Sequence, residues 1–117
     1  MNKMTENIVN FEDWAKLDLR VGEIEKVEEI EGADLLWKLM VDLGKELGKR
    51  TICAGIKKYY SKDELIGKKI IVFANLAPRK MRGIESQGML LAADQSEKGK
   101  VILLTPEKDI EVGSKIH

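Results

Sequence analysis

Three cations stand close together in the segment 75–89, and their residue types suit them to binding an anionic ligand. Arg79, Lys80 and Arg82 have no acidic neighbour between Asn75 and Gly83. The whole chain has 20 basic and 20 acidic residues and a formal net charge of zero, so the local field here can differ in sign from the total. Guanidinium and ammonium groups placed in this way can pair with phosphate oxygens.

The rest of the segment 75–89 adds polar and apolar groups to these cations. Pro78 and two glycines predict a loop that joins two apolar strands. The side chains that could reach sugar hydroxyls, base edges or an apolar surface of a ligand are Asn75, Ser86, Gln87, and Met81 or Met89. A basic surface turn without a ligand is the alternative, because the segment is poor in aromatic side chains on which a base could stack.

Two other places combine cations with aromatic rings. Trp37 and Lys38 lie where the chain enters a second strand, and Trp37 is either an exposed platform near the ligand or part of the core. Residues 57–60 (Lys-Lys-Tyr-Tyr) follow Gly55 and form a basic and aromatic cluster. We expect at least one of these tyrosines to pack inward, and the cluster is equally well explained as a ligand contact or as packing.

The residue types argue against an enzyme and against any cofactor or metal. The one histidine, His117, is the last residue, so no Ser-His or Cys-His pair can form inside the fold. The one cysteine, Cys53, lies in an apolar run, where we expect a packed thiol, and it leaves no ligand set for zinc. Glu23 and Glu25 share one side of a strand and are interpreted as a solvated charged face.

Length and hydropathy predict one domain that spans residues 1–117. The chain has 44% hydrophobic residues, which is ordinary for a globular protein and too many for a disordered one. No run of about 18 apolar residues occurs, and the first ten residues lack a signal-peptide pattern. We therefore expect a cytoplasmic protein without a membrane partner.

Apolar periodicity predicts an all-β fold. Leu17, Leu19 and Val21 alternate, and the phase changes at Gly22-Glu23, which predicts a bulge or bend that lets one long strand serve two sheets. The later strands are expected as a hairpin of 39–43 with 50–54, runs buried on both faces at 70–74 and 89–93, and a run at 101–104 that pairs behind a turn at 97–100.

Two short helices are expected between these strands. Asn10 is a candidate N-cap for a turn in which Phe11 and Trp14 share one face, and we expect that face to plug one end of the core. Ser61 and Glu64 have the spacing of a capping box, so the segment 61–67 predicts a helix between the third and fourth strands.

Several motifs occur together in the order found in a known family. The chain strongly resembles the tRNA-binding domain family, and the resemblance covers nearly its whole length. The segments that carry it are WAKLDLRVG (14–22), ADLLWKL (33–39), VDLG (41–44), AGI (54–56) and NLAPRKMRGIESQGM (75–89). In that family the domain is appended to methionyl-tRNA synthetase, forms part of bacterial phenylalanyl-tRNA synthetase, or is freestanding, and this chain resembles the freestanding form.

The resemblance implies a five-stranded Greek-key barrel of the OB type with extra C-terminal strands. It also implies a homodimer that recognises the shape of tRNA and has no catalytic activity. Such a protein acts either alone or together with the catalytic chain of methionyl-tRNA synthetase. The residues that it assigns to tRNA are Asn75, Arg79, Lys80, Arg82, Ser86 and Met89, to which we add Gln87, Trp37 and Lys38 as candidates.

The dimer contact and a second function stay open. The turn with Phe11 and Trp14 or the tail with Ile110, Val112 and Ile116 could supply an apolar dimer contact, or either could complete the monomer core. A sister branch of the same fold resembles a dimeric secretion-associated chaperone that binds extended peptides. That branch lacks the Asn-Leu-Ala-Pro-Arg-Lys and Ser-Gln-Gly-Met strings that this chain has.

Overall fold

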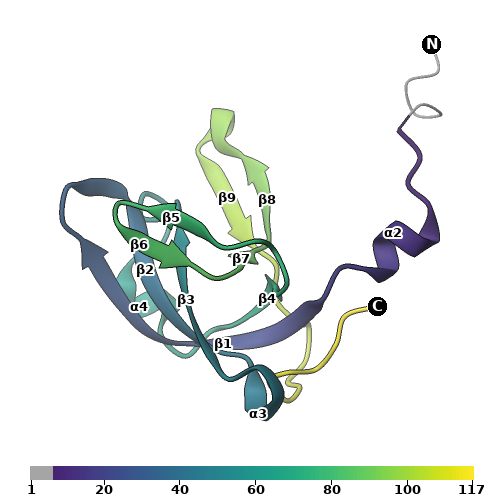
Figure 1. Cartoon of the computed structure of the whole chain (residues 1–117). Helices are drawn as coiled ribbons and strands as arrows, with labels where there is room; N and C mark the ends of the chain where they lie inside the picture. The colour runs from purple at the N-terminus through teal and green to yellow at the C-terminus, as the bar shows by residue number, and fades with distance from the viewer. Residues whose placement is uncertain (1–6) are drawn as a thin grey trace.

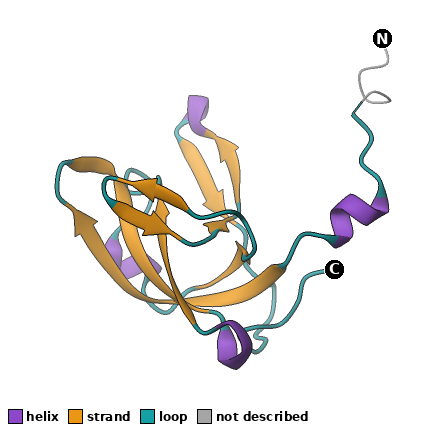
Figure 2. Cartoon of the chain, in the orientation of Figure 1, coloured by secondary structure: helices purple, strands orange, loops and turns teal. Residues whose placement is uncertain are grey.

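The structure is a computed structural model that describes residues 7–117, and most of its elements are strands (Figures 1 and 2). In chain order the elements are α2 (Phe11–Ala15), β1 (Leu19–Ile30), β2 (Ala33–Asp42), α3 (Gly44–Leu47), β3 (Lys49–Ala54), α4 (Lys62–Leu65), β4 (Lys69–Phe73), β5 (Arg79–Met81), β6 (Ile84–Ser86), β7 (Met89–Leu90), β8 (Ala92–Gln95), the 3-10 turn η1 (Ser96–Lys98) and β9 (Lys100–Leu103).

Five strands form one antiparallel sheet in the order β3-β2-β1-β4-β7. The sheet closes on itself because the segment before β7 meets β3, where the N–H of Gln87 donates to the carbonyl of Thr51 at 2.8 Å. The predicted hairpin of 39–43 with 50–54 is confirmed as β2 with β3. The predicted all-β, OB-like barrel is likewise confirmed (Figure 1).

Strand β1 is long and serves two partners, as the sequence predicts. It pairs with β4 from Leu19 to Glu23 and with β2 from Glu23 onward. Of the two alternatives predicted at Gly22-Glu23, a bulge or a bend, the bulge is wrong, because the register with β2 shifts between Ile24 and Lys26 and again between Glu29 and Ile30. Gly22 is needed for close packing instead, since a Cβ at this position would lie 2.7 Å from Val41 Cγ1.

The barrel core is apolar and is filled partly by α4. Leu65 of α4 is fully buried, and the predicted capping box is present, with Ser61 Oγ accepting from the N–H of Glu64 and the Glu64 carboxylate accepting from the N–H of Ser61. This confirms the predicted helix between β3 and β4. The other fully buried side chains are Val21, Ile24, Leu39, Val41, Leu43, Ile52, Ile70 and Val72.

Helix α2 does not plug the core, contrary to the prediction. Phe11 is 77% exposed and Trp14 38% exposed, and α2 buries none of its residues. Figure 2 shows the helix standing away from the strands. Asn10 occupies the N-cap position, but its side chain makes no cap hydrogen bond. The core cluster includes Leu65 of α4 and contains no residue of α2.

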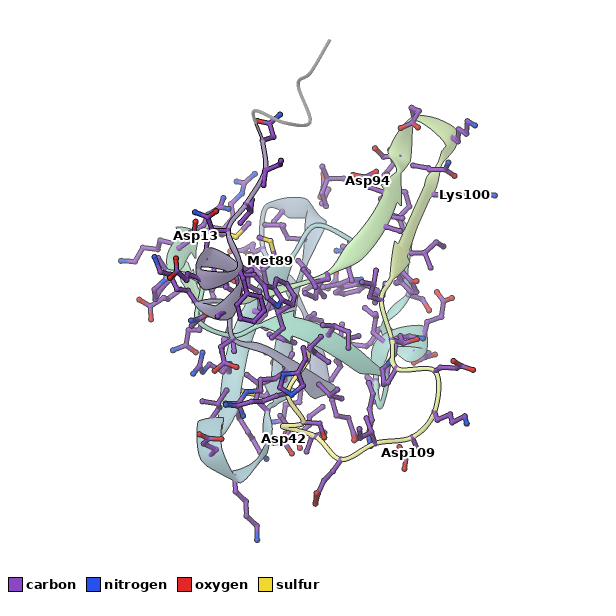
Figure 3. All side chains as sticks on the ribbon, turned by 90° about the vertical axis from the view of Figure 1, so that its right-hand side faces the viewer. Asp13, Asp42, Met89, Asp94, Lys100 and Asp109 are labelled. Atoms are coloured by element: carbon purple, nitrogen blue, oxygen red, sulfur yellow. The ribbon has the colours of Figure 1, made fainter. Side chains whose placement is uncertain are left out.

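The predicted strand at 89–93 is also wrong as a single buried strand. The chain leaves the barrel at Leu91, so β7 ends at Leu90 and β8 starts a separate hairpin with β9. Met89 and Ala93 are exposed. The pairing of 101–104 behind a turn is confirmed for β9, and Figure 3 shows Asp94 and Lys100 on this hairpin, which projects from the barrel.

The C-terminal tail completes the edge of β1 that β2 leaves open. The N–H of Val21 donates to Ser114 at 2.9 Å, and the N–H of Ile116 donates to Leu19 at 2.9 Å. Within residues 7–117, no helix is long and apolar enough to cross a membrane.

Candidate nucleic-acid interface

The predicted basic loop is a β-hairpin made of β5 and β6. Arg79 lies opposite Ser86, Lys80 opposite Glu85, and Met81 opposite Ile84. The two turn residues, Arg82 and Gly83, have φ angles of 54° and 81°. Positive φ at both positions is typical of a type I′ turn, whose twist matches that of the flanking strands. The cations are therefore carried on a regular scaffold.

A small apolar cluster anchors the hairpin to the outside of the barrel. Met81 and Ile84 pack against a buried group of Ile30, Ala33 and Cys53. These three residues come from the ends of β1, β2 and β3, so the cluster joins the hairpin to three strands of the sheet. We conclude that the position of the hairpin is set by packing before any ligand binds.

Ser86 and Gln87 use their side chains to hold the hairpin against β3. Ser86 is 5% exposed, and its Oγ accepts from the N–H of Cys53 at 2.9 Å and donates to the carbonyl of Gly88 at 3.3 Å. Gln87 Oε1 accepts from the N–H of Thr51 at 3.2 Å. Both side chains therefore position the segment in this structure, and the Ser86 hydroxyl is enclosed by protein.

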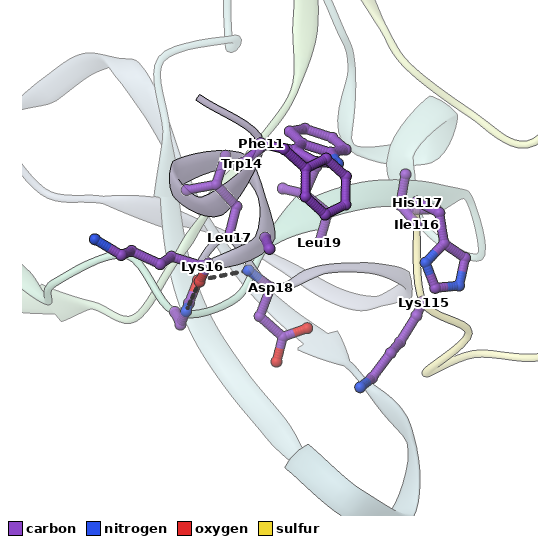
Figure 4. Close-up of a pocket in the computed structure, with 11 residues that line it drawn as sticks. Phe11, Trp14, Lys16, Leu17, Asp18, Leu19, Lys115, Ile116 and His117 are labelled. Atoms are coloured by element: carbon purple, nitrogen blue, oxygen red, sulfur yellow. Dashed lines mark hydrogen bonds between the residues drawn. The ribbon is translucent and has the colours of Figure 1, made fainter. Parts of the chain in front are cut away.

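Asn75 is exposed but also makes structural hydrogen bonds. Its Oδ1 accepts from the N–H of Asp18 at 2.8 Å, and its Nδ2 donates to the carbonyl of Lys16 at 2.7 Å. The dashed lines in Figure 4 mark these bonds, which tie the segment before β1 to the end of β4. Asn75 thus joins the segment before β1 to the chain that leads from β4 into β5.

Arg79, Lys80 and Arg82 are exposed, and none of them forms an ion pair with any residue in 7–117. They do not point the same way. Arg79 shares a face of the hairpin with Ser86, Lys80 lies on the opposite face, and Arg82 is at the tip. Arg82 Nη1 lies beside Gly32 in the β1–β2 turn, at 3.9 Å from where a Cβ atom at that position would stand. Three cations spread in this way suit an extended phosphate backbone better than one phosphate group.

The remaining predicted residues lie outside the hairpin. Trp37 is 8% exposed and its Nε1 donates to the carbonyl of Tyr60 at 2.8 Å, which confirms the core alternative for this side chain. Lys38 is half-buried, and its Nζ lies 3.7 Å from Glu28 Oε1 on the neighbouring strand β1. Met89 is exposed on β7. Among residues 7–117, no hydrogen bond or ion pair joins these side chains to the three cations.

Two arginines, Arg20 and Arg50, make structural hydrogen bonds, and neither is among the predicted site residues. Arg50 Nη1 donates to the carbonyl of Ala74 at 2.6 Å, beside Asn75. Arg20 is buried and donates to Asp18 at 2.6 Å and to Glu46 at 3.0 Å. The hydrogen bond to Asp18 raises the pKa of Arg20 above its usual value. Arg50 is in phase with the buried residues Ile52 and Ala54 of β3, and this is a signal that could have indicated an inward-pointing cation.

The thiol of Cys53 is part of the packing, as predicted. It is buried, and burial raises the pKa of the thiol, so the neutral form is favoured. No group of three or more histidine, cysteine, aspartate or glutamate residues within 7–117 is arranged to hold a metal ion.

The chain is similar to known proteins over most of its length. Residues 19–115 match the model of the family described as "Putative tRNA binding domain". The chain is 56% identical over 109 residues to the methionine–tRNA ligase of Pyrococcus horikoshii and 56% identical over 108 residues to that of Caldanaerobacter subterraneus. These matches cover 93% and 92% of this chain but only 14% and 16% of the relatives, so the chain spans about one seventh of their length.

Solved structures show the same fold at similar length. A MetRS related protein from Pyrococcus horikoshii is 39% identical, with a TM-score of 0.86, over 95% of this chain and 99% of that one. The chaperone CsaA of Bacillus anthracis is 35% identical, with a TM-score of 0.84, over 94% and 99%. Because the family model matches far more than half of the residues, this chain belongs to the tRNA-binding domain family.

Proposed function

We propose that this chain is a non-catalytic tRNA-binding protein that serves methionyl-tRNA synthetase in trans, as a separate or beta subunit. The observation that supports the proposal is the β5–β6 hairpin, which carries three unpaired cations on a packed scaffold inside a tRNA-binding domain. The curated relatives are methionine–tRNA ligases in which the matching part is a small fraction of the chain. The proposal places the protein in the cytoplasm, without a cofactor, as one unit of residues 1–117.

The hairpin would bind tRNA mainly through phosphates. Arg79 and Lys80 lie on opposite faces of the hairpin and Arg82 at its tip, so the three could contact successive phosphates along a bent backbone. Each phosphate neutralised releases counterions, which lowers the logarithm of the affinity by about 0.7 to 0.9 per tenfold increase in salt. Recognition would follow the shape of the RNA, because phosphate contacts carry no sequence information.

We further propose that two copies associate through the face formed by α2 and the C-terminal tail. Phe11, Trp14 and Leu17 are exposed here, and they line a cavity of about 440 Å³ together with Ile116 (Figure 4). Exposed apolar side chains gathered in this way favour a protein contact. A dimer would present two hairpins, and binding both to one tRNA would raise the affinity far above that of one weak site.

The direct test is tRNA binding measured by fluorescence anisotropy at low salt. The variant Arg79→Ala/Lys80→Ala/Arg82→Ala should lose most of the affinity. The matched control, Lys26→Ala/Lys45→Ala/Lys108→Ala, removes the same charge from exposed sites elsewhere and should bind nearly as well as the wild type. Equal losses in both variants would show that only total charge matters, and would overturn the assignment to the hairpin.

A peptide-binding chaperone is the second candidate function. Two of the solved structures with this fold are named as chaperones and are each 35% identical to this chain. The cavity between α2 and the tail, where Phe11, Trp14 and Leu17 lie beside polar residues, is the surface that an extended peptide would use. Binding of an apolar peptide with little dependence on salt, together with no binding of tRNA at low salt, would favour this function over the first.

A further inference from the structure

A second basic and aromatic groove lies on the molecule, formed by residues other than those of the β5–β6 hairpin. It has a volume of about 370 Å³ and runs between the segment 58–60 and strand β9. Lys58 and Tyr59 line one side, Lys100 and Ile102 line the other, and Tyr60 and Glu64 contribute to the lining. Figure 3 shows Lys100 on the projecting β8–β9 hairpin.

The two sides of this groove are held together by hydrogen bonds. The hydroxyl of Tyr60 accepts from the N–H of Leu103 in β9 at 3.1 Å. The carbonyl of Tyr60 accepts from Trp37 Nε1 at 2.8 Å, and the N–H of Tyr59 donates to the carbonyl of Ile56 at 2.9 Å. Because Tyr60 is bonded both to the barrel and to β9, the groove has a fixed width, and Tyr59 remains partly exposed beside it.

The charge of the groove is positive. Lys58 and Lys100 form no ion pair with any residue that the structure describes. The one carboxylate in the lining, Glu64, accepts from the N–H of Ser61 at 2.8 Å, so the lining has two lysines against one carboxylate. A third cation, the ammonium of Lys68, lies 5.8 Å from the centre of the Tyr60 ring.

We infer that this groove binds an unpaired nucleotide of a single-stranded RNA segment, with the base against Tyr59 and Ile102 and the flanking phosphates at Lys58 and Lys100. Aromatic rings in a cationic groove are what single-stranded nucleic acids bind, since every base has a face that can stack. The β5–β6 hairpin has cations but no aromatic ring, so the two surfaces have different chemistry. The inference goes beyond the proposed function and does not require the hairpin to bind tRNA.

The test uses an unstructured RNA of about six nucleotides with a fluorescent label, the full chain, and amide shift mapping by NMR. Tyr59→Ala should weaken binding about fivefold or more, whereas Tyr59→Phe should keep it, because the ring and not the hydroxyl makes the stack. Lys58→Gln/Lys100→Gln should weaken binding and flatten its salt dependence. Lys26→Gln/Lys45→Gln, at two exposed sites outside the groove, is the charge-matched control.

Amide shifts at 58–60 and 99–102, retained when the three hairpin cations are replaced by alanine, would support the groove. Shifts confined to 79–86, with wild-type affinity in a folded Tyr59→Ala variant, would overturn it. Displacement of the RNA by an apolar peptide, with peptide shifts at the same residues, would also overturn it in favour of a peptide site. If tRNA fails to bind while the short RNA shifts 58–60, the proposed function fails and the groove stands.

Discussion

Replacing Ser86 by alanine separates a positioning role from a ligand contact. The change removes the oxygen that accepts from the N–H of Cys53 at 2.9 Å and donates to Gly88 at 3.3 Å. Ser86 is almost fully enclosed, so water cannot replace it without a shift of the hairpin. The main loss is an unpaired buried N–H, which costs about 1–3 kcal/mol, and the longer second bond adds little. We expect a loss of about 2 kcal/mol in the free energy of unfolding.

The assay is thermal unfolding combined with hydrogen exchange. For a chain of 117 residues the entropy of unfolding near the midpoint is about 0.25 kcal/mol/K, so Ser86→Ala should lower Tm by about 8 °C. Exchange at the Cys53 amide should become faster, and tRNA affinity well below Tm should change by less than about threefold, since Met81 and Ile84 still anchor the hairpin. Ser96→Ala, at an exposed site, is the control. Unchanged stability with a large loss of affinity would refute the reasoning and assign Ser86 to the ligand.

Three other substitutions test other parts of the structure. Gly22→Ala places a methyl group 2.7 Å from Val41 Cγ1 and should lower the free energy of unfolding by about 1–3 kcal/mol, measured by chemical denaturation. An unchanged denaturation midpoint would contradict the close packing of β1 on β2. Hydrogen bonds from Ser61 lower the pKa of Glu64, so its charged form stabilises the fold above the unfolded pKa of about 4.3, and this contribution disappears as pH falls through the lower folded pKa. Glu64→Gln should therefore be less stable than the wild type at pH 7 and equal to it in acid, and a difference that persists below both pKa values would show another cause. Arg82→Asn should keep the left-handed turn and the stability of the fold, and the slope of tRNA affinity against salt should fall by the amount expected for about one phosphate contact. Loss of the hairpin structure in this variant would contradict the prediction.

Local patterns in the sequence predicted the elements whose cause is local. The capping box at Ser61 and Glu64 is present because its hydrogen bonds lie within four residues of the chain. The β2–β3 hairpin follows from alternation on both strands. The bend of β1 was predicted, but the bulge was placed at Gly22, because a glycine required by close packing looks the same in sequence as a glycine required by a bulge.

The errors concern surfaces that only the assembled barrel defines. Their apolar character and shared face predict that Phe11 and Trp14 close one end of the core, yet both are exposed on α2. The run 89–93 is apolar throughout, and nothing in it signals that the chain leaves the sheet at Leu91. In both cases the burial of an apolar residue depends on which distant segments pack against it.

The sequence predicts which segment forms the candidate interface, but not which of its side chains are exposed and which hold the segment in place. The sequence placed Arg79, Lys80 and Arg82 in one segment, and the structure keeps all three exposed. It could not show that Ser86 faces β3, because the partner of Ser86 is a backbone N–H 33 residues away. Whether each predicted residue contacts tRNA stays a prediction.

The salt dependence of tRNA binding tests the central proposal most directly. The logarithm of the binding constant should fall linearly with the logarithm of salt, with a slope of about −2 to −3 for one hairpin and about twice that if a dimer uses both. Removing the three hairpin cations should reduce the steepness of the slope by about 2 to 3 while the charge-matched control keeps it. A flat response in the wild type, or a slope that the hairpin substitutions leave unchanged, would contradict the assignment of the β5–β6 hairpin as the phosphate-binding element.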